Sequence, residues 1–114
     1  MLYVHEYAGF DAVAPLEATV SAAGSSAAMA SGAIAAANVH DLVFVGAASN
    51  GKTISRLSHG FHVRARKYGN LSADQIPKTA GAYDVTALQK GSAWVMQVAV
   101  FRRSARRRRA PPIH

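Results

Sequence analysis

The sequence predicts an all-β protein, an antiparallel β-sandwich of the jelly-roll or immunoglobulin-like type with about seven short strands. Two observations carry this prediction. Strand-like runs recur about every 8–14 residues between turn residues, and no segment has the wide apolar stripe of an amphipathic helix. A chain of 114 residues is long enough for a single core. We place this domain at residues 1–101 and a disordered basic tail at residues 102–114.

The first half of the chain contains three expected strands. Residues 2–8 alternate between two faces, and residues 16–22 form a weaker second run. Residues 29–37 are the main ambiguity, because alanine is the best helix former and residues 27–37 can also be interpreted as a helix. The serines and the glycine within this stretch favour a strand or an extended chain.

A buried strand and a turn follow. Residues 41–48, DLVFVGAA, are apolar on both faces, which is typical of a strand in the middle of a sandwich. Asn50-Gly51 predicts a tight hairpin, because both residues tolerate positive φ. A short strand is expected at residues 53–57. Residues 61–66 alternate between apolar and charged positions, which predicts a strand with one wet face.

The last third of the chain is expected to form two strands. Residues 67–70 turn the chain, and a polar loop containing Asp74 follows. Residues 83–87 alternate, and Gly91-Ser92 predicts the turn of the last hairpin. Residues 94–101 are apolar on both faces apart from a glutamine, which indicates a second central strand. Its tryptophan, Trp94, is expected in the core and not on a sugar-stacking surface.

The positive charge is concentrated in the tail. The chain carries a formal net charge of +7, with 13 lysines and arginines against 6 acidic residues. Six of these basic residues are Arg102, Arg103, Arg106, Arg107, Arg108 and Arg109. The preceding residues are therefore nearly neutral. The tail would bind nucleic acid or other polyanions through non-specific electrostatics, or it is a solvated terminus without a partner.

Composition excludes several classes of protein. With no cysteine, a disulfide scaffold and cysteine-ligated metal sites are ruled out. No signal peptide is recognisable at the start of the chain. Residues 18–39 are uncharged but consist mostly of alanine, serine and glycine, so we expect no membrane span.

No metal or cofactor site is predicted. Candidate ligands are His5, His40, His59, His62, Asp41, Asp74 and Asp84. On a strand, the spacing of His59 and His62 would point them to opposite faces. The aspartates lack the spacing of a calcium loop, and Asp41 and Asp74 are expected to be turn residues.

One segment fits the pattern of a phosphate-binding loop. Gly46 and Gly51 have the required separation, and Lys52-Thr53 follow. A phosphate loop also needs a helix after it, whereas the following residues are interrupted by Gly60 and alternate like a strand after it. We therefore predict a hairpin turn and keep nucleotide binding as the lesser alternative. With no nucleophile elbow and no suggestive pair of carboxylates, we predict that the protein is not an enzyme.

Segments along most of residues 2–101 carry a family resemblance. They are YVHEYAGF (3–10), the Pro15-Leu16 step, GSSAAMASGAIAAANVHDLVFVGAAS (24–49), GFHVRARKYGNL (60–71), AGAYDVTA (80–87) and GSAWVMQVAVF (91–101). The chain resembles a jelly-roll or concanavalin-like β-sandwich domain that is common in large secreted and cell-surface proteins of soil bacteria. The resemblance implies a structural or adhesive module outside the cell or on its surface, with carbohydrate or a cell-surface polymer as partner.

The chain departs from this family in two respects. Members usually have about as many residues again before the YVHEY-like strand, so the chain is expected to be the C-terminal half of the domain. A half-sandwich would leave open sheet edges, which predicts self-association. The Arg-rich tail has no counterpart in the family.

Overall fold

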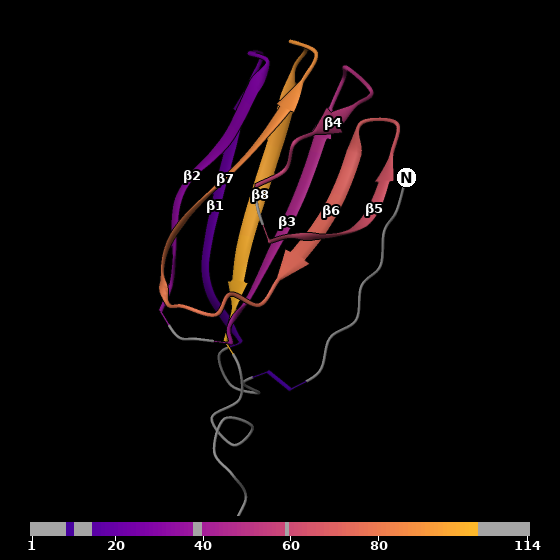
Figure 1. The fold of residues 1–114 in the computed structure, drawn as a ribbon. Helices are drawn as coiled ribbons and strands as arrows, with labels where there is room; N and C mark the ends of the chain where they lie inside the picture. The colour runs from indigo at the N-terminus through magenta and orange to yellow at the C-terminus, as the bar shows by residue number, and fades with distance from the viewer. Residues whose placement is uncertain (1–8, 11–14, 38–39, 59, 103–114) are drawn as a thin grey trace, which may run out of the picture.

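Two antiparallel sheets make up the fold in the computed structural model of the chain (Figure 1). The structure describes residues 9–10, 15–37, 40–58 and 60–102. These residues form eight strands, and none of them lies in a helix. The predicted fold class, an antiparallel β-sandwich, is confirmed, with one strand more than the sequence indicated. The strand expected at residues 2–8 lies outside the described residues.

The sheets differ in size. The larger has the order β1 (Leu16–Gly24), β8 (Trp94–Phe101), β3 (Leu42–Ser49), β6 (Asn70–Gln75) and β5 (His62–Lys67). The smaller has the order β2 (Ala28–Ala36), β7 (Gly81–Gln89) and β4 (Ile54–Ser55). Strands β3 and β8 pair along their whole lengths, from Leu42 opposite Phe101 to Ser49 opposite Trp94. The prediction of two central strands, at residues 41–48 and 94–101, is confirmed.

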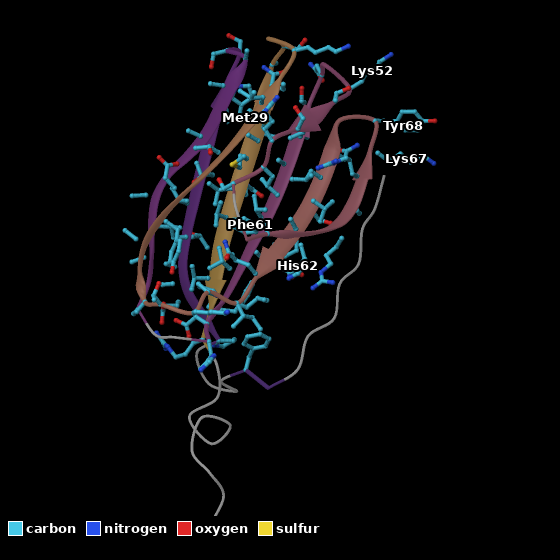
Figure 2. All side chains as sticks on the ribbon, viewed as in Figure 1. Met29, Lys52, Phe61, His62, Lys67 and Tyr68 are labelled. Carbon is cyan, nitrogen blue, oxygen red and sulfur yellow. The ribbon has the colours of Figure 1, made fainter. Side chains whose placement is uncertain are left out.

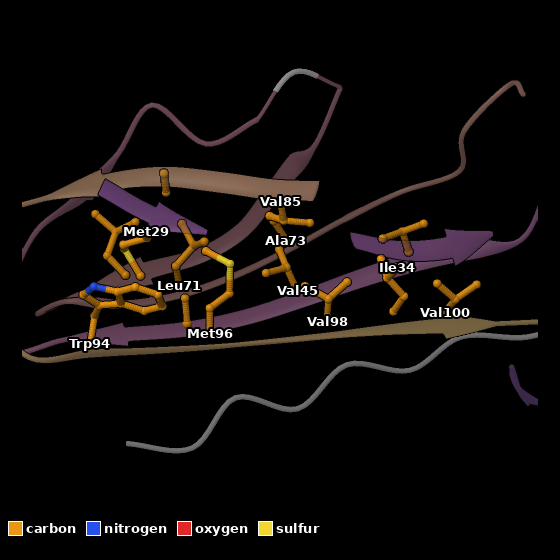
Figure 3. Packing of buried hydrophobic residues seen from close by; sticks show 14 of the residues in the cluster. Met29, Ile34, Val45, Leu71, Ala73, Val85, Trp94, Met96, Val98 and Val100 are labelled. Carbon is orange, nitrogen blue, oxygen red and sulfur yellow. The ribbon is translucent and has the colours of Figure 1, made fainter. Parts of the chain in front are cut away.

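The core lies between the inner faces of the two sheets (Figure 3). Met96, Val98 and Val100 of β8 are buried, and across the core Met29 of β2 and Val85 of β7 are buried as well. Alternate residues of a strand point to opposite faces, so the intervening side chains of β8 lie on the outer face of the larger sheet. Trp94 is 8 % exposed and belongs to this core, as the sequence predicted.

The alanine-rich segment is a strand and not a helix. In β2, the two residues between Ala30 and Ala33 lie opposite a single residue of β7, Val85, which is a β-bulge. Gly32 takes a φ of 85° at this point. The buried Ser31 hydroxyl accepts a hydrogen bond of 3.0 Å from the backbone N–H of Val85. Tertiary pairing with β7 therefore overrides the helix propensity of alanine.

The predicted tight hairpin at Asn50-Gly51 is wrong. These residues lie in a turn closed by a 3.3 Å bond from Lys52 N to Ser49 O, but the chain then crosses to β4 in the other sheet. The positive φ falls on Lys52, at 66°. The tight hairpin instead joins β5 to β6 at Tyr68-Gly69, whose φ values of 51° and 80° are both positive.

The predicted hairpin at Gly91-Ser92 is wrong for the same reason. It links β7 and β8, which belong to different sheets. A turn sequence specifies a change of direction, whereas the sheet that the chain enters next depends on the packing of the whole domain.

A strand replaces the predicted polar loop around Asp74. Residues Asn70–Gln75 form β6, and Asp74 is only 3 % exposed. The Arg64 side chain on β5 donates two hydrogen bonds of 2.9 Å to the Asp74 carboxylate. This bidentate pair compensates the burial of the charge.

The prediction that the apolar side chains of residues 61–66 face the core is wrong for Val63. This residue is 41 % exposed, because β5 is an edge strand.

Candidate functional site

Several connections between strands meet at one end of the sandwich. The register places Ser49 opposite Trp94 and Ala48 opposite Asn70, so the β3–β4, β5–β6 and β7–β8 connections lie together. Backbone hydrogen bonds tie them to one another. Ser49 N donates to Gly69 O over 2.7 Å, and Asn50 N donates to Ala93 O over 2.9 Å. The three connections therefore form one rigid surface and not three independent loops.

These connections carry three lysines and an exposed tyrosine, which we call the lysine end: Lys52, Lys67, Tyr68 and Lys90. Figure 2 shows Lys52, Lys67 and Tyr68 at the same corner of the molecule. The Lys67 Nζ atom lies 5.3 Å from the centroid of the Tyr68 ring, a cation–π contact. Tyr68 remains 71 % exposed.

Close backbone packing fixes the position of each lysine. A Cβ atom on Gly69 would lie 3.0 Å from the Cα of Lys52, so the β5–β6 hairpin touches the β3–β4 turn. A Cβ atom on Gly51 would lie 3.2 Å from the Cβ of Lys90, so the same turn also touches the β7–β8 connection. Three positive charges are thus held on neighbouring backbone segments.

Within the described ranges, the acidic side chains lie away from the lysine end. Glu17 lies near the start of β1, and Asp41 directly precedes β3. Both positions are at the end of the sandwich that faces away from the lysine end. Asp74 pairs with Arg64, and Asp84 on β7 accepts a 3.2 Å hydrogen bond from Gly32 N. The charges of the three lysines are therefore not neutralised by a described carboxylate, and this end of the molecule has a positive potential.

A shallow hollow lies at the ends of β3 and β8, at the same end of the sandwich as the lysines. It has a volume of about 260 Å³ and is lined by Ala48, Asn50, Ala93, Trp94 and Val95. Its lining combines apolar side chains with the Asn50 amide.

The opposite end of the sandwich holds a buried acidic group. The Glu17 side chain is 8 % exposed and accepts a 2.9 Å hydrogen bond from Ala37 N. Arg102 Nε lies 3.5 Å from the Glu17 carboxylate, and the Asp41 side chain hydrogen-bonds the same carboxylate. Burial raises the pKa of Glu17, but the bonds from Ala37, Asp41 and Arg102 together hold this pKa below its ordinary value of 4.5.

This lowered pKa predicts a loss of stability in acid. A carboxyl whose pKa is lower in the folded state stabilises the fold above its unfolded pKa, and this stabilisation is lost as the pH falls through the folded value. We expect Glu17→Gln to lower the free energy of unfolding by about 1–2 kcal/mol at pH 7 and by less at pH 3. Urea denaturation at both pH values checks this, with Asp84→Asn as the control for one lost charge. An equal loss at both pH values would contradict it.

Of the predicted polyanion-binding residues, the structure describes only Arg102. Arg102 N donates a 2.6 Å hydrogen bond to Pro15 O, and its guanidinium pairs with Glu17. Arg102 is therefore attached to the folded domain. Arg103, Arg106, Arg107, Arg108 and Arg109 lie outside the described residues.

The phosphate-loop pattern falls on a strand and a turn. Gly46 lies inside β3, between Ser72 on β6 and Gln97 on β8, so it is part of the sheet ladder. Gly51, Lys52 and Thr53 follow in the turn, and the two-residue strand β4 comes next. The helix N-terminus that a phosphate loop uses does not follow this segment.

The candidate metal ligands are dispersed. His40 and His62 are exposed, on the turn before β3 and on β5, while His5 and His59 lie outside the described residues. Among the residues that the structure describes, no three histidine, aspartate or glutamate side chains are grouped so that they could hold a metal ion. Asp41 does precede a strand, as predicted, but it is fully buried.

Sequence reasoning missed the lysine end, although a signal for it is present. Each of its three lysines stands next to or near a turn glycine, in Gly51-Lys52, Lys67-Tyr68-Gly69 and Lys90-Gly91. Turns of a sandwich cluster at its two ends. Assigning each turn to an end would have brought the three lysines together.

None of the described residues belongs to a helix long and apolar enough to cross a membrane. Comparison with protein-family models, with curated proteins and with solved structures found no match to this chain.

Proposed function

We propose that the chain is a non-catalytic, adhesive β-sandwich module that binds carbohydrate at a cell surface through the lysine end. The observation that carries this proposal is the rigid surface formed by three connections, on which Tyr68 is 71 % exposed. Binding residues on loops held by a rigid sandwich are a common arrangement in recognition domains. The resemblance to sandwich domains of secreted bacterial proteins supports an extracellular setting.

The chemistry of the lysine end suits sugars. An exposed aromatic ring packs against the apolar C–H face of a sugar, while ammonium, amide and backbone groups hydrogen-bond its hydroxyls. Tyr68 provides the ring, and Lys52 and Asn50 provide donors nearby.

Replacing the exposed ring tests this function. We expect Tyr68→Asn to weaken binding to isolated bacterial cell-wall polysaccharide by about 3–10-fold, because stacking of the ring is lost. Asparagine tolerates the positive φ of 51° at this position, so the hairpin is retained. Affinity electrophoresis measures the change, with Ile76→Asn, which alters an exposed apolar residue after β6, as the control. Equal binding by both variants would contradict the proposal.

Two further partners remain proposals beside this one. The arginines of residues 102–109 provide a separate means of binding nucleic acid or another polyanion.

Self-association would use an open sheet edge, and the β1 edge is better suited to this pairing than the β5 edge. The β5 edge carries Arg66 and Lys67, whose like charges oppose pairing between two copies.

A further inference from the structure

We infer that the ligand of the lysine end is an acidic polysaccharide, a chain of sugars that bear carboxylates. This inference rests on the proposed carbohydrate-binding function and adds the chemical class of the ligand. Three features of the surface support it: the charge, the spacing of the lysines and the aromatic content.

The charge requires an anionic ligand. Lys52, Lys67 and Lys90 lie on three backbone segments that touch one another, and no described carboxylate faces them. Placing like charges on adjacent segments is unfavourable for the isolated domain. A ligand that supplies negative charge along its length would relieve this repulsion.

The spacing of the lysines suits a polymer better than a single small anion. They come from three different connections. A chain that carries one carboxylate on each sugar can contact several separate ammonium groups in succession. Lysine acts as a point charge on a flexible stem, which accommodates the irregular positions of such carboxylates.

The aromatic content favours a polysaccharide over a single-stranded nucleic acid. Proteins that bind single strands stack successive bases on several aromatic side chains. The described part of the lysine end presents one such ring, Tyr68. One ring matches one sugar unit, with the remaining contacts made by charge.

The decisive comparison uses polygalacturonate and the same polymer with its carboxylates fully methyl-esterified. The protein is the full chain with Arg103, Arg106, Arg107, Arg108 and Arg109 changed to glutamine, which leaves Arg102, the partner of Glu17, as the one arginine of the tail. We expect binding to polygalacturonate that weakens as salt rises, and weak binding to the ester. The triple variant Lys52→Gln, Lys67→Gln and Lys90→Gln should bind polygalacturonate at least about 10-fold more weakly.

Controls separate the ways in which the inference could fail. Lys78→Gln removes a lysine from the connection between β6 and β7, at the opposite end, and should leave binding unchanged. Equal binding to acid and ester would overturn the acidic class and leave the carbohydrate function standing. Binding to neither polymer would overturn the acidic class, and the Tyr68→Asn comparison on cell-wall polysaccharide would then decide the carbohydrate function. Tighter binding to single-stranded DNA, lost in the triple variant, would assign the surface to nucleic acid. All the substituted lysines are on connections or strand ends, and circular dichroism verifies that each variant is folded.

Discussion

The Gly69→Ala variant is expected to lose about 3 kcal/mol of unfolding free energy. Gly69 has a φ of 80° in the tight hairpin between β5 and β6. An added Cβ would lie 2.1 Å from the Ser49 carbonyl oxygen and 3.0 Å from the Cα of Lys52, both of them backbone atoms. The hairpin would have to move away from the β3–β4 turn, and the 2.7 Å bond from Ser49 N to Gly69 O would be lost. Urea denaturation followed by circular dichroism measures the loss.

A second glycine separates backbone strain from the steric clash. Gly91 has a similar φ of 77°, and a Cβ added there would meet nothing within 4 Å. Gly91→Ala should therefore lose only the strain of a left-handed alanine, about 1 kcal/mol. If the two variants lost the same free energy, the contact between the hairpin and the β3–β4 turn would be contradicted.

The Met96→Ala variant should lose a similar free energy, about 3 kcal/mol, by a different mechanism. The Met96 side chain is fully buried between the sheets (Figure 3). Its neighbours in register, Ala22 on β1 and Ala47 on β3, are small, and the same core holds Met29 and Leu71. Truncating a methionine that is buried in a packed core leaves a cavity, because the surrounding side chains relax only in part. The midpoint of urea denaturation should fall, while the slope stays the same.

The adjacent residue provides the matched control. Val95 precedes Met96 on β8, but it points to the outer face and is 43 % exposed. Val95→Ala should change the free energy of unfolding by about 0.5 kcal/mol or less. Equal losses at the two positions would mean that the smaller sheet does not cover this face of β8.

The sequence predicted those parts of the fold whose information is local. The alternation of residues 83–87 and the apolar runs at residues 41–48 and 94–101 identify strands, because large side chains repeat with the period of a sheet. Strand β6 could not be found in this way. Its Asp74 looks like a loop residue until Arg64, ten positions earlier, is known to neutralise it.

The position of the tight hairpin is a second feature that the local sequence does not predict. Asn50-Gly51 is the stronger hairpin sequence, yet the tight hairpin forms at Tyr68-Gly69, where Tyr68 adopts a positive φ. Packing of the hairpin against Ser49 fixes that conformation, and nothing in the local sequence encodes this contact. The lysine end depends on the same contacts. Its residues are visible in the sequence, but their proximity follows from which turns share an end of the sandwich.

The bulge in β2 helps to fix how this alanine-rich strand aligns with β7. The outward-facing residues of β2 are four alanines and Gly32, so they do little to fix its alignment with β7, while Met29, Ser31 and Ile34 face the core. The Ser31 hydroxyl accepts a hydrogen bond from Val85 N, and Gly32 N donates one to the Asp84 carboxylate. Together with the core positions of Met29 and Ile34, these two bonds specify one alignment of the strand.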